Sequence, residues 1–232
     1  MKKLIYLLLV LGIALIVGCS LKKPCESIAD PATKDDCLFE RALESGSLND
    51  CNSIQSDSVK NPCIAEIGIM KEDQSICDSI DGMSRDYCIT KIAMSAKDFS
   101  RCNQVSTTYW SDICVKEFAV SDNNFTRCAK ISNLFEKDEC YNAIAQNIAK
   151  VEPCFYIYNE TNHDLCVRRI AVATLNESLC EETKTVVIGD ICYQKIAQLK
   201  KNESICDGAS YWDIKNACKA AVRSILNKTE QD

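Results

Sequence analysis

Large apolar and small residues recur between polar stretches in a pattern that repeats about every 26 residues. In most periods a large apolar residue directly precedes a small one, as in Ile144–Ala145, and a further apolar residue such as Ile131 stands earlier in the period. These positions lie three, four or five residues after a cysteine. Such spacing places side chains on one side of an α-helix rather than on alternate faces of a strand. The pattern therefore predicts one helical hairpin in each period.

The cysteines keep the same period. From Cys25 to Cys218 the gaps alternate between 12 and 14 residues, with one gap of 11 between Cys77 and Cys88. Self-similarity at a period of 20–50 residues is typical of stacked repeat proteins. We therefore expect an all-α fold, an α-solenoid of eight hairpins of about 26 residues over 25–226, followed by a polar tail over 227–232.

An Asp or Asn stands two residues before the second cysteine of every period. We interpret these residues as caps or first-turn residues of the second helix, where they accept from free amides and oppose the positive end of the helix dipole. A ridge of metal ligands is the alternative, which the Asn members disfavour. The positions are Asp35, Asn61, Asp86, Asp112, Asp138, Asp164, Asp190 and Asn216.

Geometry favours disulfides within each hairpin. Both cysteines of a hairpin lie at similar distances from its turn, which suits the ~5.5 Å Cα separation of a disulfide. Pairing with the next hairpin would shift the partners by about 6 Å along the helix axis and leave Cys25 and Cys218 unpaired. Bonds between stacked hairpins stay an alternative. The expected pairs are Cys25–Cys37, Cys51–Cys63, Cys77–Cys88, Cys102–Cys114, Cys128–Cys140, Cys154–Cys166, Cys180–Cys192 and Cys206–Cys218.

Composition indicates the compartment in which the protein folds and argues against several functions. An even set of regularly spaced cysteines is typical of an exported chain that folds in an oxidising compartment. The chain has 27 basic and 33 acidic residues, so its surface gives no electrostatic reason to bind nucleic acid. With a single histidine and no C-x-x-C motif, we expect no His-based zinc site, no metal and no cofactor.

No catalytic motif is present, and we expect no enzyme activity. His163 is either a solvated turn residue, which we favour, or a lone base beside Asp164. The pair Glu181–Glu182 is interpreted as part of a solvated helix face, because acid–base chemistry requires a dry cleft. An enzyme that acts on envelope polymers remains a third functional hypothesis.

The first residues indicate export. Lys2 and Lys3 precede an apolar run, and Ile16-Val17-Gly18-Cys19-Ser20 follows it. The run is too short to span a bilayer comfortably and has the size of a secretory core segment. The segment resembles the lipobox of prokaryotic lipoproteins. That resemblance implies a signal peptide over 1–18, removal of which leaves Cys19 as a lipid-bearing N-terminus, with acyl chains such as palmitate, and a tether over 19–24. An ordinary signal peptide and an uncleaved anchor helix are the alternatives.

The repeat as a whole resembles the Sel1-like proteins in architecture alone. Those proteins also stack cysteine-linked helical hairpins, but their repeats are longer than 26 residues. No functional residue is carried over from them.

Aromatic residues gather in the links between the two cysteines of three hairpins. Such links emerge along one edge of a solenoid, where aromatic side chains are common contact anchors. We therefore consider them a possible binding surface; the favoured alternative is that they cover hairpin ends and fill gaps. The residues are Tyr109, Trp110, Phe155, Tyr156, Tyr158, Tyr211 and Trp212.

Five N-x-[ST] sequences are possible N-glycosylation sites, at Asn124, Asn159, Asn176, Asn202 and Asn227. Three of these also coincide with the expected start of a hairpin's first helix, where Asn and Ser arise for capping alone.

The first functional hypothesis is a non-enzymatic helical-repeat scaffold, anchored by lipid to the outer side of a prokaryotic membrane and binding a protein or glycan partner. It follows from the extended surfaces that stacked repeats provide. The second hypothesis is a structural envelope component or spacer without a specific ligand.

Overall fold

The structure is a computed structural model that describes residues 24–229. The chain divides into two compact units, which meet in the sequence between Lys71 and Glu72. Unit 1 holds the first two hairpins and unit 2 holds the other six. The predicted signal peptide, Cys19 and all of the tether except Pro24 lie outside the described residues. The sequence predicts one array over 25–226 and no boundary at this place.

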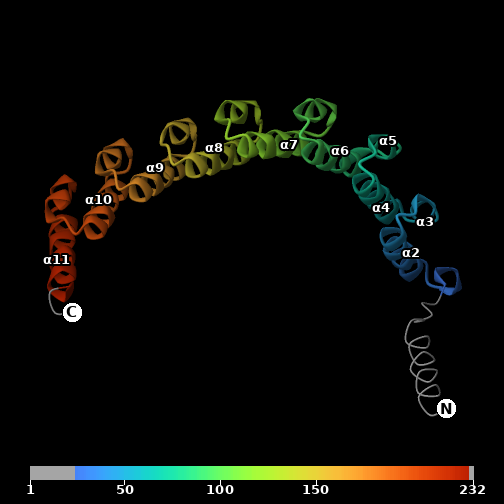
Figure 1. The fold of residues 1–232 in the computed structure, drawn as a ribbon, viewed down its shortest axis with the longest axis horizontal. Helices are drawn as coiled ribbons and strands as arrows, with labels where there is room; N and C mark the ends of the chain where they lie inside the picture. Colours follow the sequence, from blue (N-terminus) through green and yellow to red (C-terminus); the bar gives the residue numbers. More distant parts are fainter. Residues whose placement is uncertain (1–23, 230–232) are drawn as a thin grey trace, which may run out of the picture. The chain divides into compact units, whose positions relative to one another are not determined.

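Each hairpin joins a short helical segment to a long α-helix (Figure 1). In unit 1 the pairs are η1 (Cys25–Ser27) with α2 (Pro31–Ser45), and α3 (Leu48–Asn52) with α4 (Asp57–Met70). Unit 2 begins with α5 (Gln74–Cys77) and α6 (Gly82–Ala96), followed by η2 (Phe99–Gln104) with α7 (Thr108–Ser121) and η3 (Phe125–Lys130) with α8 (Leu134–Ile148). It continues with η4 (Glu152–Tyr156) and α9 (Glu160–Thr174), η5 (Glu177–Glu182) and α10 (Val186–Lys200), and η6 (Glu203–Gly208) and α11 (Trp212–Thr229). No strand occurs within residues 24–229, and the predicted all-α repeat is confirmed.

The two members of a hairpin are less alike than expected. The sequence predicts a hairpin of two helices, but the first member is short: η2 ends at Gln104, two residues after Cys102. The next residue, Val105, is extended, as are its equivalents Ile131 and Ile157. Ile131 and Ile157 are buried, so the extended residue that follows these short segments belongs to the core. At the other end of the array, α11 continues to Thr229, so 227–229 belong to a helix rather than to a tail.

All eight predicted disulfides are present and lie within their hairpins. The Cα–Cα distances are 5.5–5.8 Å, in the range that an unforced disulfide needs. Most of these cysteines are completely buried, such as Cys128 and Cys140. Each bond therefore fixes a short segment against the long helix of the same hairpin.

Buried Asp residues connect one hairpin to the next. The prediction that they cap their own helix is wrong: Asp112, for example, is the fifth residue of α7. Its carboxylate instead accepts hydrogen bonds from the backbone amides of Ser132 and Asn133, at the start of the next long helix. We call this paired bond the Asp clamp. Its six examples, at 2.6–3.0 Å, join Asp35 to 55–56, Asp86 to 106–107, Asp112 to 132–133, Asp138 to 158–159, Asp164 to 184–185 and Asp190 to 210–211.

The two Asn members of the series lie in the last described hairpin of each unit. Asn61 belongs to the last hairpin of unit 1, and Asn216 belongs to the last hairpin of unit 2. An Asn side chain has only one acceptor oxygen, whereas the clamp needs two. At Asn61 the exchange of Asp for Asn thus coincides with the boundary between the two units.

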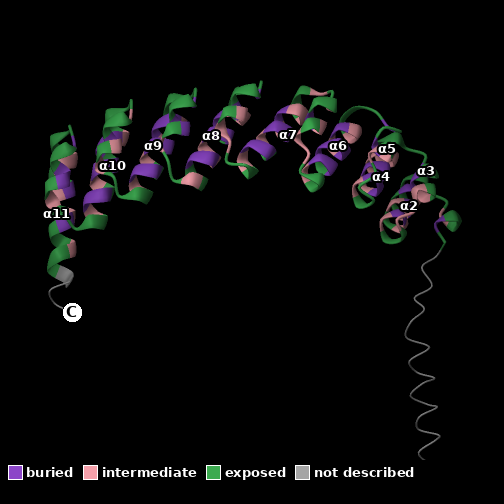
Figure 2. Ribbon diagram, turned by 45° about the horizontal axis from the view of Figure 1, so that its top comes forward, coloured by how far each residue is buried: buried purple, intermediate pink, exposed green. Residues whose placement is uncertain are grey.

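Long helices in unit 2 pack in sequence order, from α6 on α7 to α10 on α11. Their buried faces carry the periodic apolar and small residues, including Ile144, Ala145, Ile170 and Ala171 (Figure 2). The small residue also takes part in ending the helix: the Ala145 carbonyl accepts from the amide of Lys150 at 3.2 Å. Between them Ala149 adopts a left-handed conformation with φ 52°, which gives the helix end a Schellman-type geometry.

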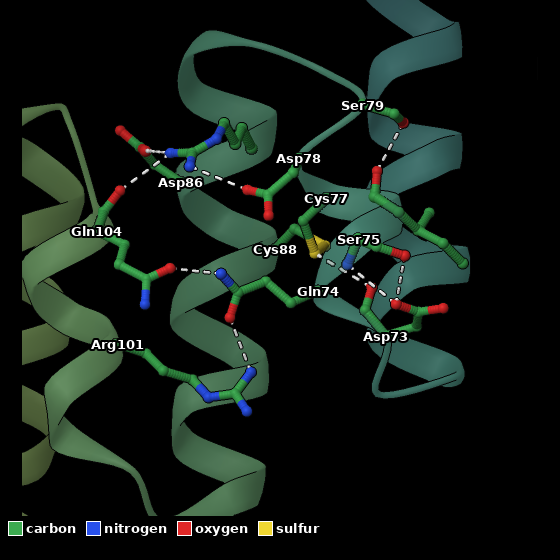
Figure 3. The surroundings of a disulfide bond; sticks show 12 residues. Asp73, Gln74, Ser75, Cys77, Asp78, Ser79, Asp86, Cys88, Arg101 and Gln104 are labelled. Atoms are coloured by element: carbon green, nitrogen blue, oxygen red, sulfur yellow. Dashed lines mark hydrogen bonds and ion pairs between the residues drawn. A yellow bond between two sulfur atoms is a disulfide. The ribbon is translucent and has the colours of Figure 1, made fainter.

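The shortened third hairpin has a polar network around its disulfide, Cys77–Cys88 (Figure 3). Arg85 donates to the Gln104 carbonyl and to Asp78, both at 3.0 Å. Arg101 donates to the Gln74 side chain at 2.8 Å, and that side chain in turn donates to the side chain of Gln104. These bonds connect α5 and α6 to η2, although this hairpin has one residue fewer between its cysteines than the others.

Candidate binding surface

Exposed apolar side chains concentrate at the starts of the long helices in unit 2. Every hairpin of unit 2 contributes at least one, within two residues of the first residue of its long helix. We call this set the apolar ridge. Its members are 43–79% exposed and are Met83, Tyr109, Leu134, Phe135, Tyr158, Val186, Val187, Tyr211 and Trp212.

The Asp clamp explains why these side chains form a row. Each clamp ties the start of one long helix to the second turn of the helix before it, as Asp138 does for Tyr158 and Asn159. Helix starts therefore follow one another along one edge of unit 2. In unit 1 the corresponding first two positions of each long helix hold small or polar residues or Pro, at 31–32 and 57–58.

The ridge includes four of the seven aromatic residues singled out in the sequence: Tyr109, Tyr158, Tyr211 and Trp212. The sequence search missed its aliphatic members and Phe135 because it looked for aromatic clusters. The available signal was register, since most of these residues stand five or six positions before the second cysteine of a hairpin.

The other three aromatic residues pack against neighbouring rings. Trp110 is half-buried, with its ring centroid 5.3 Å from that of Tyr87, and its buried Nε1 has no hydrogen-bond partner in the described part of the chain. The exposed Tyr156 in η4 stacks on Tyr141 at 5.4 Å. Phe155, also exposed, lies 6.2 Å from the ring of His163. Trp110 and Tyr156 therefore fit the alternative of rings that fill gaps between hairpins.

His163 is not the solvated turn residue that the sequence suggested. Asn159 caps α9, so His163 falls inside that helix, and its ring is buried. Its Nδ1 lies 2.9 Å from Oδ1 of Asp164. Burial raises the pKa of the Asp164 carboxyl, but hydrogen bonds from Thr185, His163 and the amide of Lys184 outweigh it, so the net pKa is lowered. The Asp164 carboxylate forms the Asp clamp between α9 and α10, and His163 lies beside it. Both side chains are buried and therefore not accessible to a substrate.

Glu181 and Glu182 are exposed, as expected of a solvated face. Glu181 accepts a hydrogen bond from the Tyr193 hydroxyl at 3.2 Å. Burial, together with the charge of Glu181, raises the pKa of Tyr193 to about 12. Glu181 thus borders a packed tyrosine, and Glu182 is exposed.

Three of the five predicted glycosylation sites cap short segments. In Asn124, Asn176 and Asn202, Oδ1 accepts from the amide and the hydroxyl of the Ser or Thr two residues later. Asp98 makes the same bonds to Ser100 without forming a glycosylation sequence. Capping by itself therefore accounts for these three sequences, and attachment of a sugar stays a prediction.

The remaining two sites also lie in helical surroundings. Asn159 caps α9 by accepting from the amide of Asn162, and Asn227 is exposed in the last turn of α11.

Two further features of residues 24–229 concern metal binding and membrane insertion. No group of three or more His, Cys, Asp or Glu side chains in this range is arranged to hold a metal ion. No helix in the same range combines the length and the apolar character that spanning a bilayer requires.

Comparison with protein-family models, with curated proteins and with solved structures found no match to this chain.

Proposed function

We propose that this chain is an exported, non-enzymatic repeat scaffold that binds a partner protein along the apolar ridge. The observation that carries this proposal is the row of exposed apolar side chains present in all six hairpins of unit 2. Contiguous exposed apolar surface commonly marks an interaction site. The fold itself does not require it, because unit 1 has the same hairpins without such side chains.

Composition of the ridge favours a protein over a glycan. Tyr and Trp suit either partner, but Met83, Leu134, Val186 and Val187 offer no flat face on which a sugar ring stacks. Aromatic residues and Met are enriched in protein interfaces, and the fully buried core of such an interface is more apolar than the rest of the surface.

Eight buried disulfides indicate folding in an oxidising, extracytoplasmic compartment. The lipobox-like segment ending at Cys19 supports attachment to the outer side of a prokaryotic membrane by a lipid on that residue. Two or more acyl chains anchor a protein stably, whereas one chain binds reversibly.

The test is capture of the partner from detergent-solubilised envelopes with the full chain as bait. We expect a saturable partner of fixed stoichiometry. The double variant Phe135→Ser/Trp212→Ser should abolish capture of that partner. Met70→Ser, an exposed residue of unit 1, is the matched control and should capture normally. Capture that persists in the double variant contradicts the ridge, and the absence of any saturable partner favours a structural spacer.

A further inference from the structure

A groove separates the outer faces of α9 and α10, on the side opposite the buried Val167 and Ile170. Its volume is about 420 Å³, within the range of ligand-binding pockets, and it opens to solvent along its length. Val172, Ala173 and Ile191 give it an apolar floor.

Three cations border this floor: Arg168, Arg169 and Lys195. None of them forms an ion pair with another described residue; Arg169 donates only to the amide oxygen of Asn142, at 3.3 Å. No acidic residue lines the groove. The groove lining therefore carries three positive charges and no negative one, while Arg169 also borders the hollow between α8 and α9 beside Asp138 and Glu139.

The repeat shows that the fold does not impose these cations. Arg169 and Lys195 both stand three residues after the second cysteine of their hairpins. The equivalent residues in the other six hairpins are Glu40, Glu66, Lys91, Glu117, Ala143 and Ala221. The repeat accepts an acid or a neutral residue at this position, so it does not require the cations that α9 and α10 place there.

We propose that the α9–α10 groove binds an acidic amphipathic helix of a partner protein. The apolar face of such a helix would fill the floor over Val172 and Ile191, and its flanking carboxylates would meet Arg168, Arg169 and Lys195. Helix-in-groove recognition uses this combination of apolar anchors and charged rims. Arginine suits it well, because its planar fork holds a carboxylate through two parallel hydrogen bonds.

This site is separate from the apolar ridge in its chemistry and in its test. One ridge residue, Val187, lies one helical turn from the groove residue Ile191 in α10. The two residues changed in the ridge variant, Phe135 and Trp212, lie in α8 and α11, which do not line the groove. Phe135→Ser and Trp212→Ser should leave the groove unchanged. Failure of one proposal therefore does not affect the other.

The experiment measures binding of a labelled synthetic helix, with Leu on one face and Glu beside it, to the full chain by fluorescence anisotropy. We expect saturable binding that weakens as salt rises. The triple variant Arg168→Gln/Arg169→Gln/Lys195→Gln should weaken it at least tenfold, and Ile191→Asp should do the same. A control with equal loss of charge, Lys150→Gln/Lys184→Gln/Lys201→Gln, changes exposed lysines outside the groove lining and should bind as the native chain does.

Three outcomes would overturn the proposal. The first is equal weakening by the control variant, which shows attraction without a site. The second is undiminished binding of a peptide in which Gln replaces every Glu. The third is binding of inorganic phosphate or of anionic phospholipid vesicles with no binding of the peptide.

Discussion

Asp138 in α8 accepts a hydrogen bond from the backbone amide of Asn159, at 3.0 Å, and Asn159 is the residue that caps α9. The other oxygen of the same carboxylate takes the amide of Tyr158 at 2.7 Å. One buried side chain thus fixes where the next long helix begins. It also fixes where Tyr158 emerges on the apolar ridge, so the packing of the repeat and its proposed binding surface depend on the same contact.

Replacing Asp138 with Asn should destabilise the protein. Asn accepts through one oxygen only, so one buried amide is left unpaired, at a cost of about 1–3 kcal/mol in free energy of unfolding. Denaturant unfolding under non-reducing conditions measures the loss, and hydrogen exchange should accelerate at the amides of Tyr158 and Asn159. Glu139→Gln, the exposed neighbour, is the control and should change stability by less than about 0.5 kcal/mol. Equal stability of the two variants would contradict the clamp.

A glycine at position 149 should stabilise the chain. Ala149 holds φ at 52°, a left-handed conformation that costs a residue with a Cβ about 1–2 kcal/mol. Ala149→Gly relieves this strain, and the greater freedom of Gly in the unfolded chain offsets part of the gain, so we expect about 0.5–1 kcal/mol from thermal or denaturant unfolding. Ala143→Gly, within α8, should instead lose about 1 kcal/mol. A loss at both positions would refute the helix-end geometry.

Removing one disulfide should weaken its hairpin locally. In Cys128→Ala/Cys140→Ala the lost bond closes a loop of 12 residues, for which the chain-entropy model gives about 3 kcal/mol. Hydrogen exchange should locate the loss in η3 and α8, with α10 and α11 less affected, because a repeat protein is coupled mainly through neighbours. A uniform loss of protection over the whole of unit 2 would contradict this.

Acid should weaken the α9–α10 contact through Asp164. Its pKa is lowered in the folded chain, so its contribution is complete above the unfolded value of about 3.9 and is lost as the pH falls through the folded value. Unfolding followed from pH 6 to pH 2 should show this acid limb, and Asp164→Asn should flatten it. An unchanged limb in the variant would exclude Asp164 as its source.

The sequence predicted the hairpins and their disulfides because cysteine spacing depends on contacts within one period. It misplaced the role of Asp138 and its equivalents because their partners lie 20–21 residues downstream, in a neighbour whose stacking no local pattern describes. The length of the short segments could not be predicted from the sequence either, since residues such as those of η6 suit an α-helix and a 3₁₀ turn equally well. Asn61, one of only two exceptions in the Asp series, was the available sign of the boundary between units.

The candidate surface was found in part. The search for aromatic clusters reached Tyr158 and Trp212, but it also selected Trp110, whose ring packs against Tyr87. Exposure cannot be read from residue type when a ring is large enough to bridge two hairpins. The basic groove was missed because Arg169 and Lys195 are unremarkable alone and gain meaning only when α9 packs beside α10.

Site-specific photo-crosslinking in the native envelope tests the central claim, that the apolar ridge binds a protein, most directly. A photoreactive phenylalanine analogue is placed at Phe135, at Tyr158 or at Trp212, and at Met70 as an exposed control in unit 1. We expect the three ridge positions to yield one adduct of the same mass and Met70 to yield none. No adduct from the ridge, or an equal yield from Met70, would contradict the claim.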